Sequence, residues 1–485
     1  MTGTGRITAA LPFPTAARQQ LADGQLRANL RRATRTIRDR RARTVAQVPD
    51  WEALRAAGTA IKDDVLNRLP ELLEQFEAAA GAAGAQVHWA RDAAEACAVV
   101  TALVQATGSD EVVKVKSMAT QEIGLNEALA AAGITAVETD LAELIVQLAD
   151  DTPSHILVPA IHYNRRQIRD ILAAGLPAAE AARLTDDPTV LAEAARRRLR
   201  QRFLAARVAV CGANFAVAET GSLVVVESEG NGRMCLTLPE TLICVVGLEK
   251  LVPTFTDLEV FLQLLPASAT GERMNPYTSV WTGVRPDDGP RSVHVVLLDN
   301  GRADTLTDGV GRQALRCIRC SACLNVCPVY EQVGGHAYGS TYPGPIGAVL
   351  SPQLTGFDAG ANRTLPYAST LCGACYDVCP VGINIPEVLV HLRQKSVDAR
   401  RARPSPERAA MQAMSWVMRD RRRYRAALRA ARRGAAPLRW TARAPGSVRR
   451  LPWPLSAWTT HRNAPLPAAQ TFREWWAGRD PEASR

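Results

Sequence analysis

RCIRCSACLNVCPV (316–329) carries four cysteines in the pattern C-x2-C-x2-C-x3-C-P, and LCGACYDVCPV (371–381) carries three in the pattern C-x2-C-x3-C-P. A shift of 52 residues superimposes three cysteines of the first stretch on the three of the second, namely Cys320, Cys323 and Cys327 on Cys372, Cys375 and Cys379. Alanine, valine and proline residues next to them match as well. The chain therefore contains an internal repeat of closely spaced thiols.

The spacing of the first motif suits a cubane iron–sulfur cluster. Three thiolates, each separated from the next by two residues, let one short loop hold three corners of the cubane. The fourth cysteine, which is followed by proline, ligates the other cluster. This rule predicts that one [4Fe–4S] cluster is held by Cys317, Cys320, Cys323 and Cys379. It predicts that a second cluster is held by Cys327, Cys372 and Cys375.

Zinc is the alternative metal, because four thiolates also form structural zinc sites. Zinc sites usually pair two C-x2-C knuckles and do not place three cysteines in one loop, so iron–sulfur is favoured. Ser369 stands in the second repeat where Cys317 stands in the first, which leaves the second cluster with three cysteine ligands. Three forms stay open: a [4Fe–4S] cluster with a non-cysteine fourth ligand, which we favour, a [3Fe–4S] cluster, or an iron with an open position.

The region before the cysteines reads as an α/β domain. Helical spacing runs through residues 15–83, and short β-branched runs then alternate with helical segments up to about residue 300. The runs predict strands over 111–115, 155–160, 207–210, 222–228, 241–247 and 293–299. Such alternation predicts a largely parallel sheet, and the close spacing within 207–247 predicts hairpins there.

These patterns divide the chain into four predicted parts. They are an N-terminal helical segment packing on the α/β domain (1–84), the α/β domain (85–305), a ferredoxin-type [4Fe–4S] domain (306–395) and a basic, Trp-rich C-terminal region (396–485). The long gap between the two motifs and a predicted helix over 385–395 favour the α-helical kind of ferredoxin domain.

The chain has 485 residues, of which 47% are hydrophobic and 22% charged, as in globular proteins. Neither a secretory signal nor a run near the ~18 apolar residues of a membrane span is visible, so we expect a cytoplasmic protein. In a reducing compartment, thiols bind metal or stay free. The cysteines outside the motifs lie among aliphatic residues and are expected to be buried and free: Cys97, Cys211, Cys235 and Cys244.

The net charge of +10 is concentrated in residues 27–43 and 400–450. A basic excess suits nucleic acid, anionic lipid or an acidic partner, although a solvated helical face is the simpler explanation. Six tryptophans make the C-terminal region too aromatic for a disordered tail, so we expect it to dock on the rest of the chain or on a partner. They are Trp416, Trp440, Trp453, Trp458, Trp475 and Trp476.

Some polar residues of the α/β region could serve a small carboxylate. Lys114, Lys116 and Arg165 could bind it, although ion-paired or solvated roles are simpler. Glu219 could be catalytic if the domain kept transferase chemistry, but nothing else indicates a covalent intermediate.

Other patterns have simple structural interpretations. SEGNGR (228–233) is favoured as a tight turn between strands over a phosphate-binding loop. His155 and His162 are favoured as locally hydrogen-bonded residues over metal ligands. No dinucleotide fingerprint opens a helix, so no tightly bound nicotinamide or flavin is predicted.

The cysteine motifs, the connector YPGPIGAVLSP (342–352) and LPYASTLCGACYDVCPV (365–381) resemble the lactate utilisation protein B family. The resemblance continues upstream in four stretches: 113–129, 153–168, 212–233 and 241–254. It implies an N-terminal LUD domain, whose fold resembles the sugar-phosphate isomerase and CoA-transferase group. It also implies that the second motif commonly offers three cysteines, which makes Ser369 less unusual.

The resemblance further implies an electron carrier in an L-lactate-oxidising complex with two sister subunits. Binding of nucleic acid is not expected, and contact with a membrane surface, though not a transmembrane segment, is left open. Two alternatives stand beside it: a nucleic-acid-binding iron–sulfur protein, suggested by the arginine-rich tail, and a LUD-domain enzyme that acts alone on a small carboxylate.

Overall fold

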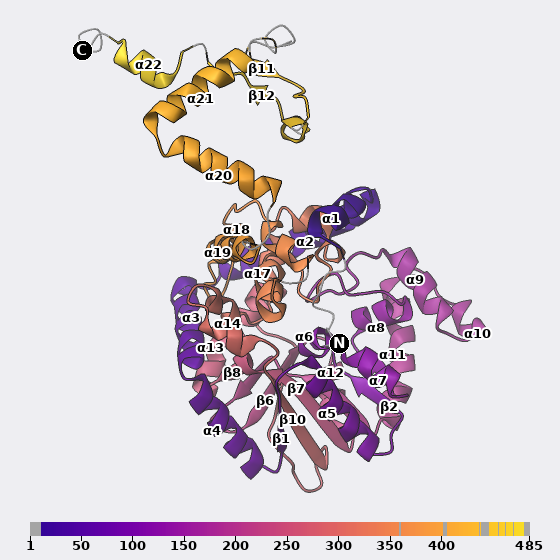
Figure 1. The fold of residues 1–485 in the computed structure, drawn as a ribbon. Coiled ribbons are helices and arrows are strands. Elements are labelled where there is room, and N and C mark those ends of the chain that lie inside the picture. The colour runs from indigo at the N-terminus through magenta and orange to yellow at the C-terminus, as the bar shows by residue number, and fades with distance from the viewer. Residues whose placement is uncertain are drawn as a thin grey trace. The chain divides into compact units, whose positions relative to one another are not determined.

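Six parallel strands form the sheet that carries the candidate site, in the order β1-β10-β7-β4-β2-β3 in this computed structural model (Figure 1). Their bounds are β1 Gln86–Ala90, β2 Glu111–Lys114, β3 Thr135–Glu138, β4 Val208–Gly212, β7 Thr241–Gly247 and β10 Ser292–Leu298. Strands buried on both faces are apolar throughout, as in β7, where Cys244 packs on one side and Ile243 on the other. The parallel sheet predicted from strand–helix alternation is confirmed.

Helices cover both faces of this sheet. On one face lie α5 (Ala93–Ala106) and α7 (Leu125–Ala131). On the other lie α4 (Leu69–Ala82), α11 (Pro188–Ala205) and α12 (Asn231–Thr237). The other helices of this region are α6 Met118–Glu122, α8 Leu141–Leu148, α9 Arg165–Ala174, α10 Ala178–Ala181, α13 Phe255–Ala269 and α14 Arg302–Thr307, with the 3-10 turn η1 Leu248–Lys250.

A second sheet of four strands has the order β8-β5-β6-β9. Its strands are β5 Phe215–Val217, β6 Ser222–Glu227, β8 Leu251–Val252 and β9 Tyr277–Trp281. Strands β5 and β6 pair antiparallel, which confirms the hairpin predicted within 207–247. The turn between them needs Gly221 at φ +66°, where a Cβ atom would lie 2.2 Å from the backbone nitrogen of Ala80 in α4.

Residues 155–160 were predicted as a strand, and this is wrong. The imidazole Nδ1 of His155 accepts from the backbone N–H groups of Leu157 and Val158, both at 3.0 Å, and Ser154 donates to the carbonyl of Pro159. These local hydrogen bonds take the donors that a strand would offer to its neighbour. The segment is therefore an irregular loop.

The N-terminal helices are α1 Phe13–Leu21, α2 Gly24–Val45, α3 Trp51–Asn67 and α4. Both α2 and α3 pack on α13, and both also contact the cysteine-containing region. The N-terminal segment thus joins the α/β part to the cysteine loops.

The cysteine-containing region is helical in its described residues. Its elements are η2 Gly311–Arg316, α15 Ala322–Asn325, α16 Tyr330–Val333, η3 His336–Tyr338, α17 Gly344–Thr355, η4 Asn362–Tyr367, α18 Ala374–Asp377 and α19 Ile385–Asp398. Its buried cysteines share one apolar core with Phe215 of β5 and Phe261 of α13. This core fixes the position of the cysteine loops against the α/β part.

The structure describes residues 11–357, 360–400, 405–435, 437, 446–453, 455–460, 462–468 and 470–479. Residues 1–399 form one unit and 400–485 a second. The second unit contains α20 Pro406–Met418, α21 Arg421–Gly434, β11 Ser447–Val448, η6 Leu455–Thr459, β12 Ala464–Pro465 and α22 Phe472–Ala477. Arginines stack on its tryptophans, as Arg423 does on Trp416 at 4.3 Å, whereas Trp440 lies outside the described residues.

Within the described ranges, no helix combines the length and the apolar character needed to cross a bilayer.

Candidate iron–sulfur centre and the adjoining cavity

The two motifs bring four thiols around one small cavity. It is lined by Cys317, Cys320, Cys323 and Cys379, with isoleucine side chains such as Ile346 on its walls. Burial, followed by the charge of Cys317, raises the pKa of Cys320 to about 12. The fourth thiol comes from the second motif, because the chain after α18 returns to the first loop. We call these four residues the first cysteine group.

The remaining three motif cysteines lie together at a neighbouring place. Burial, followed by the charges of Cys327 and Cys372, raises the pKa of Cys375 to about 12. Cys372 is exposed, whereas Cys327 and Cys375 are buried. We call these three residues the second cysteine group. Cys323 of the first group feels the charge of Cys375, so the two groups are adjacent.

Backbone geometry repeats around the two groups. Arg319 and Leu371, which are equivalent in the repeat, have φ of +63° and +57°, and Ser321 and Gly373 are also left-handed. Alternation of left-handed and ordinary residues turns successive N–H groups toward one concavity, an arrangement that binds anions such as cluster sulfides. The cysteine loops are thus shaped for a negatively charged group.

Backbone N–H groups also point at sulfur atoms of the two cysteine groups. Cys379 Sγ accepts from the N–H of Ile383 at 3.3 Å, and Cys327 Sγ accepts from that of Tyr330 at 3.5 Å. Such hydrogen bonds stabilise thiolates and tune the potential of an iron–sulfur cluster.

The residues present fit an iron–sulfur cluster. Five of the seven motif thiols are buried, and burial disfavours their ionisation: Cys320, Cys323, Cys327, Cys375 and Cys379. Iron would bind them as thiolates and remove that cost, because ligand deprotonation and metal binding are coupled. Ser369 lies near the second group in sequence, and its Oγ accepts from the N–H of Leu371 at 3.1 Å.

Two arginines from the N-terminal helices hold the second motif. Arg55 of α3 donates from Nε to the carbonyl of Cys379 at 2.9 Å, and Arg41 of α2 donates to the carbonyl of Val378 at 2.9 Å. Sequence reasoning treated this basic stretch as a solvated helical face, and Arg41 is an exception to it. Nothing in the sequence around Arg41 indicates that its side chain bonds a backbone carbonyl of the second motif.

A buried ionic network connects the α/β part to the first cysteine group. Arg302 donates to Glu249 at 2.5 Å and to Glu122 at 2.8 Å, and Arg319 donates to Glu249 at 2.9 Å. Burial alone would raise the pKa of Glu249, but the charges of Arg302 and Arg319 hold it at about 2. The hydroxyl of Tyr342 donates to Glu122 at 2.6 Å, and its ring lies under Arg319.

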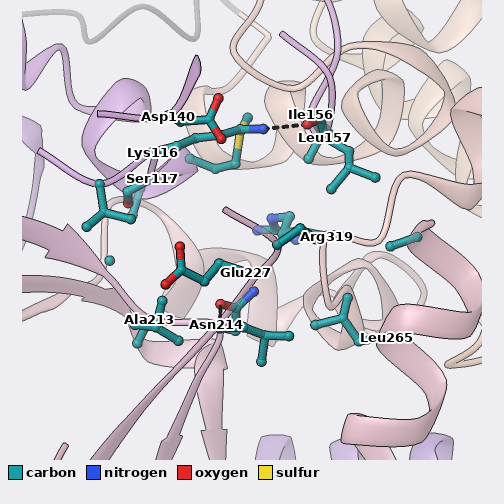
Figure 2. A pocket seen from close by; sticks show the side chains of 18 of the residues that line it. Lys116, Ser117, Asp140, Ile156, Leu157, Ala213, Asn214, Glu227, Leu265 and Arg319 are labelled. Atoms are coloured by element: carbon teal, nitrogen blue, oxygen red, sulfur yellow. Dashed lines mark hydrogen bonds between the residues drawn. The ribbon is translucent and has the colours of Figure 1, made fainter. Parts of the chain in front are cut away.

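A cavity of about 410 Å³ lies at the carboxyl ends of β2, β4 and β7. Crevices at this edge of a parallel sheet are the usual place for ligands in α/β folds. Figure 2 shows Lys116 and Asp140 on one side and Glu227 and Asn214 on the other, with Arg319 between them. Because Arg319 belongs to the first motif, the cavity and the first cysteine group share a wall.

Lys250 also lines this cavity and is the last residue of η1, the turn that follows the carboxyl end of β7. Burial and the nearby charge of Arg319 lower its pKa to about 8. Among the described residues, none forms a hydrogen bond or an ion pair with its ammonium group. This is an unsatisfied cation facing the cavity.

Of the lysines and the arginine singled out from sequence, only one faces the cavity. Lys114 is buried against Glu138 at 2.6 Å, which confirms the ion-paired interpretation, and Arg165 is exposed. Lys116 lines the cavity and donates to the carbonyl of Leu157 at 2.9 Å (Figure 2). Glu219 is exposed and outside the cavity wall.

SEGNGR (228–233) was predicted as a tight turn between strands, and this is wrong. It leads from β6 into α12, with Gly230 left-handed before the first helical residue. Glu227 accepts from the N–H groups of Gly232 at 2.8 Å and Arg233 at 2.7 Å. A carboxylate of the chain itself therefore occupies the donors that a phosphate would use.

His155 and His162 make the local hydrogen bonds favoured from sequence. Asn325 of α15 lies 3.2 Å from His155 Nε2, and burial lowers the pKa of His155 to about 3. His162 contacts Ser154 at 2.6 Å and Asp151 at 3.1 Å. Asp151, His162 and His336 each bring one atom within 4.8 Å of the others, the one such group of metal-ligating side chains in the described part of the chain.

The four cysteines outside the motifs are all buried and free, as predicted. Sequence reasoning missed five buried or half-buried charges in the shared wall or directly behind it: Glu249, Lys250, Arg302 and Arg319, which line the cavity, and Glu122, which pairs with Arg302. Charged residues are usually exposed, so a buried ionic network carries no periodic signal. The position of Arg319 between two cysteines was the one available clue.

Comparisons with known proteins give a consistent result. Residues 73–298 match the LUD domain family, residues 313–383 the 4Fe-4S dicluster domain, and residues 391–480 the C-terminal region of lactate utilisation protein B. Lactate utilization protein B of Oceanobacillus iheyensis is 43% identical, over 89% of each chain. The proteins of that name from Macrococcus caseolyticus and Bacillus subtilis are 41% and 40% identical, over 96% and 92% of this chain and 97% and 92% of their own.

Proposed function

The chain belongs to the lactate utilization protein B family, and on that premise we propose that it carries electrons in a complex that oxidises L-lactate to pyruvate. The relatives' name gives lactate utilisation as the process, and the dicluster match gives an iron–sulfur protein. The complex would consist of this chain and its sister subunits, acting in the cytoplasm.

The proposal assigns two [4Fe–4S] clusters to the two cysteine groups. When bound, a cluster supplies one-electron oxidation and reduction, so a pair suits the two electrons that lactate releases. The single observation that carries the proposal is the separation of seven thiols into two adjacent groups, each drawing on both motifs. The form of the second cluster, with three cysteines and Ser369, follows the sequence-based preference for a non-cysteine fourth ligand.

The chain's own residues prepare each site for electron transfer. Apolar side chains such as Ile346 and Ile383 exclude water from the first group, and backbone N–H groups orient the sulfurs. The second group reaches the surface, where Cys372, Leu371 and Tyr376 are exposed. Electrons would therefore leave or enter at the second group, within reach of a sister subunit.

Two finer features of the fold belong to the proposal. The helices that surround the cysteines support the α-helical kind of ferredoxin domain. The parallel sheet with a site at its carboxyl edge is compatible with the sugar-phosphate isomerase and CoA-transferase group.

The test is anaerobic reconstitution of the full chain, followed by iron and sulfide analysis. Two cubanes give about eight iron atoms, and a three-iron second centre gives about seven. The oxidised protein is then mixed with L-lactate and the sister subunits, and the visible absorbance is followed. We expect bleaching only when the sister subunits are present. Zinc in place of iron, or bleaching by lactate and this chain alone, would contradict the proposal.

A further inference from the structure

We propose that the cavity at the carboxyl edge of the parallel sheet binds a hydroxycarboxylate, with its carboxylate on Lys250 beside the first cysteine group. The binding itself is independent of the proposed electron transfer. Only its effect on the cluster rests on the ligation of that cluster by Cys317. Three features of the cavity support the proposed binding: an unsatisfied cation, a wall of hydrogen-bond acceptors and a wall shared with the cysteines.

The cationic end is built from the ionic network. Arg302 and Arg319 are matched by Glu122 and Glu249, which accept their hydrogen bonds. The ammonium group of Lys250 remains without an ion-pair partner, because no carboxylate of the described residues pairs with it. Lys250 is half-buried at the cavity wall, and a partly desolvated charge without a partner favours an anionic ligand.

The opposite wall offers acceptors whose charge is already engaged. Asp140 caps α8 by accepting from the N–H groups of Ala142 and Glu143, at 3.0 and 3.2 Å. Glu227 accepts from the N–H groups of Gly232 and Arg233 in the first turn of α12. The positive end of a helix dipole offsets the charge of such a carboxylate. The carboxylate oxygens can still accept further hydrogen bonds.

This wall therefore suits a neutral donor, such as a hydroxyl, better than a second cation. A ligand that spans the cavity would carry a carboxylate at one end and a hydroxyl at the other. The ammonium group of Lys116 bonds one carbonyl and keeps two donors for the same carboxylate. The volume of about 410 Å³ lies in the range of small-molecule sites and also accommodates acids longer than lactate.

The cation end is coupled to the first cysteine group. Lys250 feels the charges of Arg319 and Cys317, and Arg319 Nη1 donates to the carbonyl of Cys317 at 3.3 Å. An anion bound on Lys250 adds negative charge next to this group. It would bind more tightly to the oxidised protein and would lower the potential of the first cluster.

The first experiment measures binding to the reconstituted full chain by isothermal titration calorimetry. The probes are L-lactate, D-gluconate as a longer hydroxy acid, propionate as a carboxylate without the hydroxyl, and L-alanine, whose ammonium replaces the hydroxyl. We expect a hydroxy acid to bind at least about tenfold more tightly than propionate, which leaves the acceptor wall unpaired. We expect a similar preference over L-alanine, whose ammonium would lose its hydration beside carboxylates whose charge is already engaged. A preference between L-lactate and D-gluconate identifies which length of acid the site takes.

The variant is Lys250→Gln, and its matched control is Lys395→Gln. Lys395 lies on α19 and pairs with Asp308, away from the cavity. Lys250→Gln should weaken binding by about tenfold or more through loss of a charge-assisted hydrogen bond, and Lys395→Gln should leave it unchanged. Absence of binding by either hydroxy acid, unchanged binding in Lys250→Gln with normal iron content, or equal binding of propionate or L-alanine would overturn the proposal.

The second experiment titrates the first cluster by EPR with and without the preferred acid. A tenfold preference of the acid for the oxidised protein corresponds to about 59 mV for one electron. We expect the potential to fall in wild type and not in Lys250→Gln. If the acid binds in the calorimeter but the protein shows no iron–sulfur EPR signal at any potential, the proposed electron transfer is refuted and the ligand site is not. If the clusters are intact but no acid binds, the ligand site is refuted and the electron transfer is not.

Discussion

Glu143 is a single residue whose environment sets a pH dependence. It lies buried on α8, where burial and the charge of Glu138 raise its pKa to about 7. The carboxyl pKa in an unfolded chain is about 4.5, so the folded protein binds this proton more tightly. Stability therefore falls as the pH rises through the window from about 4.5 to about 7, and the loss is complete above it.

We expect Glu143→Gln to remove this loss. The variant should be more stable than wild type at pH 8, by up to about 3 kcal/mol, and similar at pH 5. Gln121, which donates to Glu143 at 3.0 Å, keeps an oxygen acceptor in the variant. Urea midpoints at the two pH values measure the effect. Equal midpoint differences between variant and wild type at pH 5 and pH 8 would show that Glu143 does not titrate in this window.

At the scale of elements, the β5–β6 turn approaches α4 so closely that only glycine fits. A Cβ atom on Gly221 would meet the backbone of Ala80, whereas one on Gly108 meets nothing within 4 Å, and both residues have positive φ. Gly108→Ala should cost about 1–2 kcal/mol, for left-handed backbone alone. Gly221→Ala should cost about 1–3 kcal/mol more, because a helix must move.

The two glycine variants form a matched pair, since backbone strain is common to both. Urea unfolding of the full chain gives the difference between them. Similar midpoints would mean that the hairpin and α4 can separate at little cost, contrary to the tight contact in the structure.

The second element-scale prediction concerns the attachment of α3 to the second motif. Arg55 donates to the carbonyls of Cys379 and Tyr376, whereas Arg68, at the end of the same helix, pairs only with exposed carboxylates. Arg55→Ala should remove about 1.5–3 kcal/mol of local stability, since the guanidinium is charged. Cluster loss to a chelator should then be about 10–150-fold faster.

Arg68→Ala is the control and should lose its clusters at the wild-type rate. The decay of visible absorbance after addition of the chelator gives both rates. If Arg55→Ala decays no faster than Arg68→Ala, the N-terminal helices do not hold the cysteine loop.

The elements themselves were largely readable from the sequence, and the exceptions have local causes. The runs over 207–210, 222–228, 241–247 and 293–299 became strands because apolar and β-branched residues favour buried sheet. The apolar run 155–160 did not, because the imidazole of His155 captured its N–H groups. Periodicity records side-chain burial and does not record such side-chain acceptors.

At the scale of the whole molecule, the thiol motifs were recognisable because their spacing is local, but the wall they share with the cavity was not. Arg319 and Glu249 are 70 residues apart, and they meet only because β7 ends beside the first cysteine loop. Pairing over such a distance depends on the complete topology. Apart from Lys116, which the sequence had singled out, the candidate ligand site therefore emerged only from the structure.

The proposed exchange of ligands between the motifs also concerns the whole molecule, because it would join segments that lie on either side of α17. If each motif lends its last cysteine to the other cluster, Cys379→Ser removes a ligand from the first cluster and Cys327→Ser from the second. If each motif instead kept its own last cysteine, these effects would be reversed. Serine is a poor iron ligand unless deprotonated, so each variant should lose about half of its iron.

Alkylation of the anaerobic variants, followed by mass spectrometry, identifies the lost cluster, because thiols bound to iron are protected. In Cys379→Ser we expect Cys317, Cys320 and Cys323 to become modified while the second cysteine group stays protected. In Cys327→Ser, Cys372 and Cys375 should become modified. Cys97→Ser, a buried thiol outside the motifs, should keep its full iron content. Modification of Cys372 and Cys375 in Cys379→Ser would mean that each loop closes on its own cluster and that the grouping of thiols in the folded chain is not the grouping of ligands.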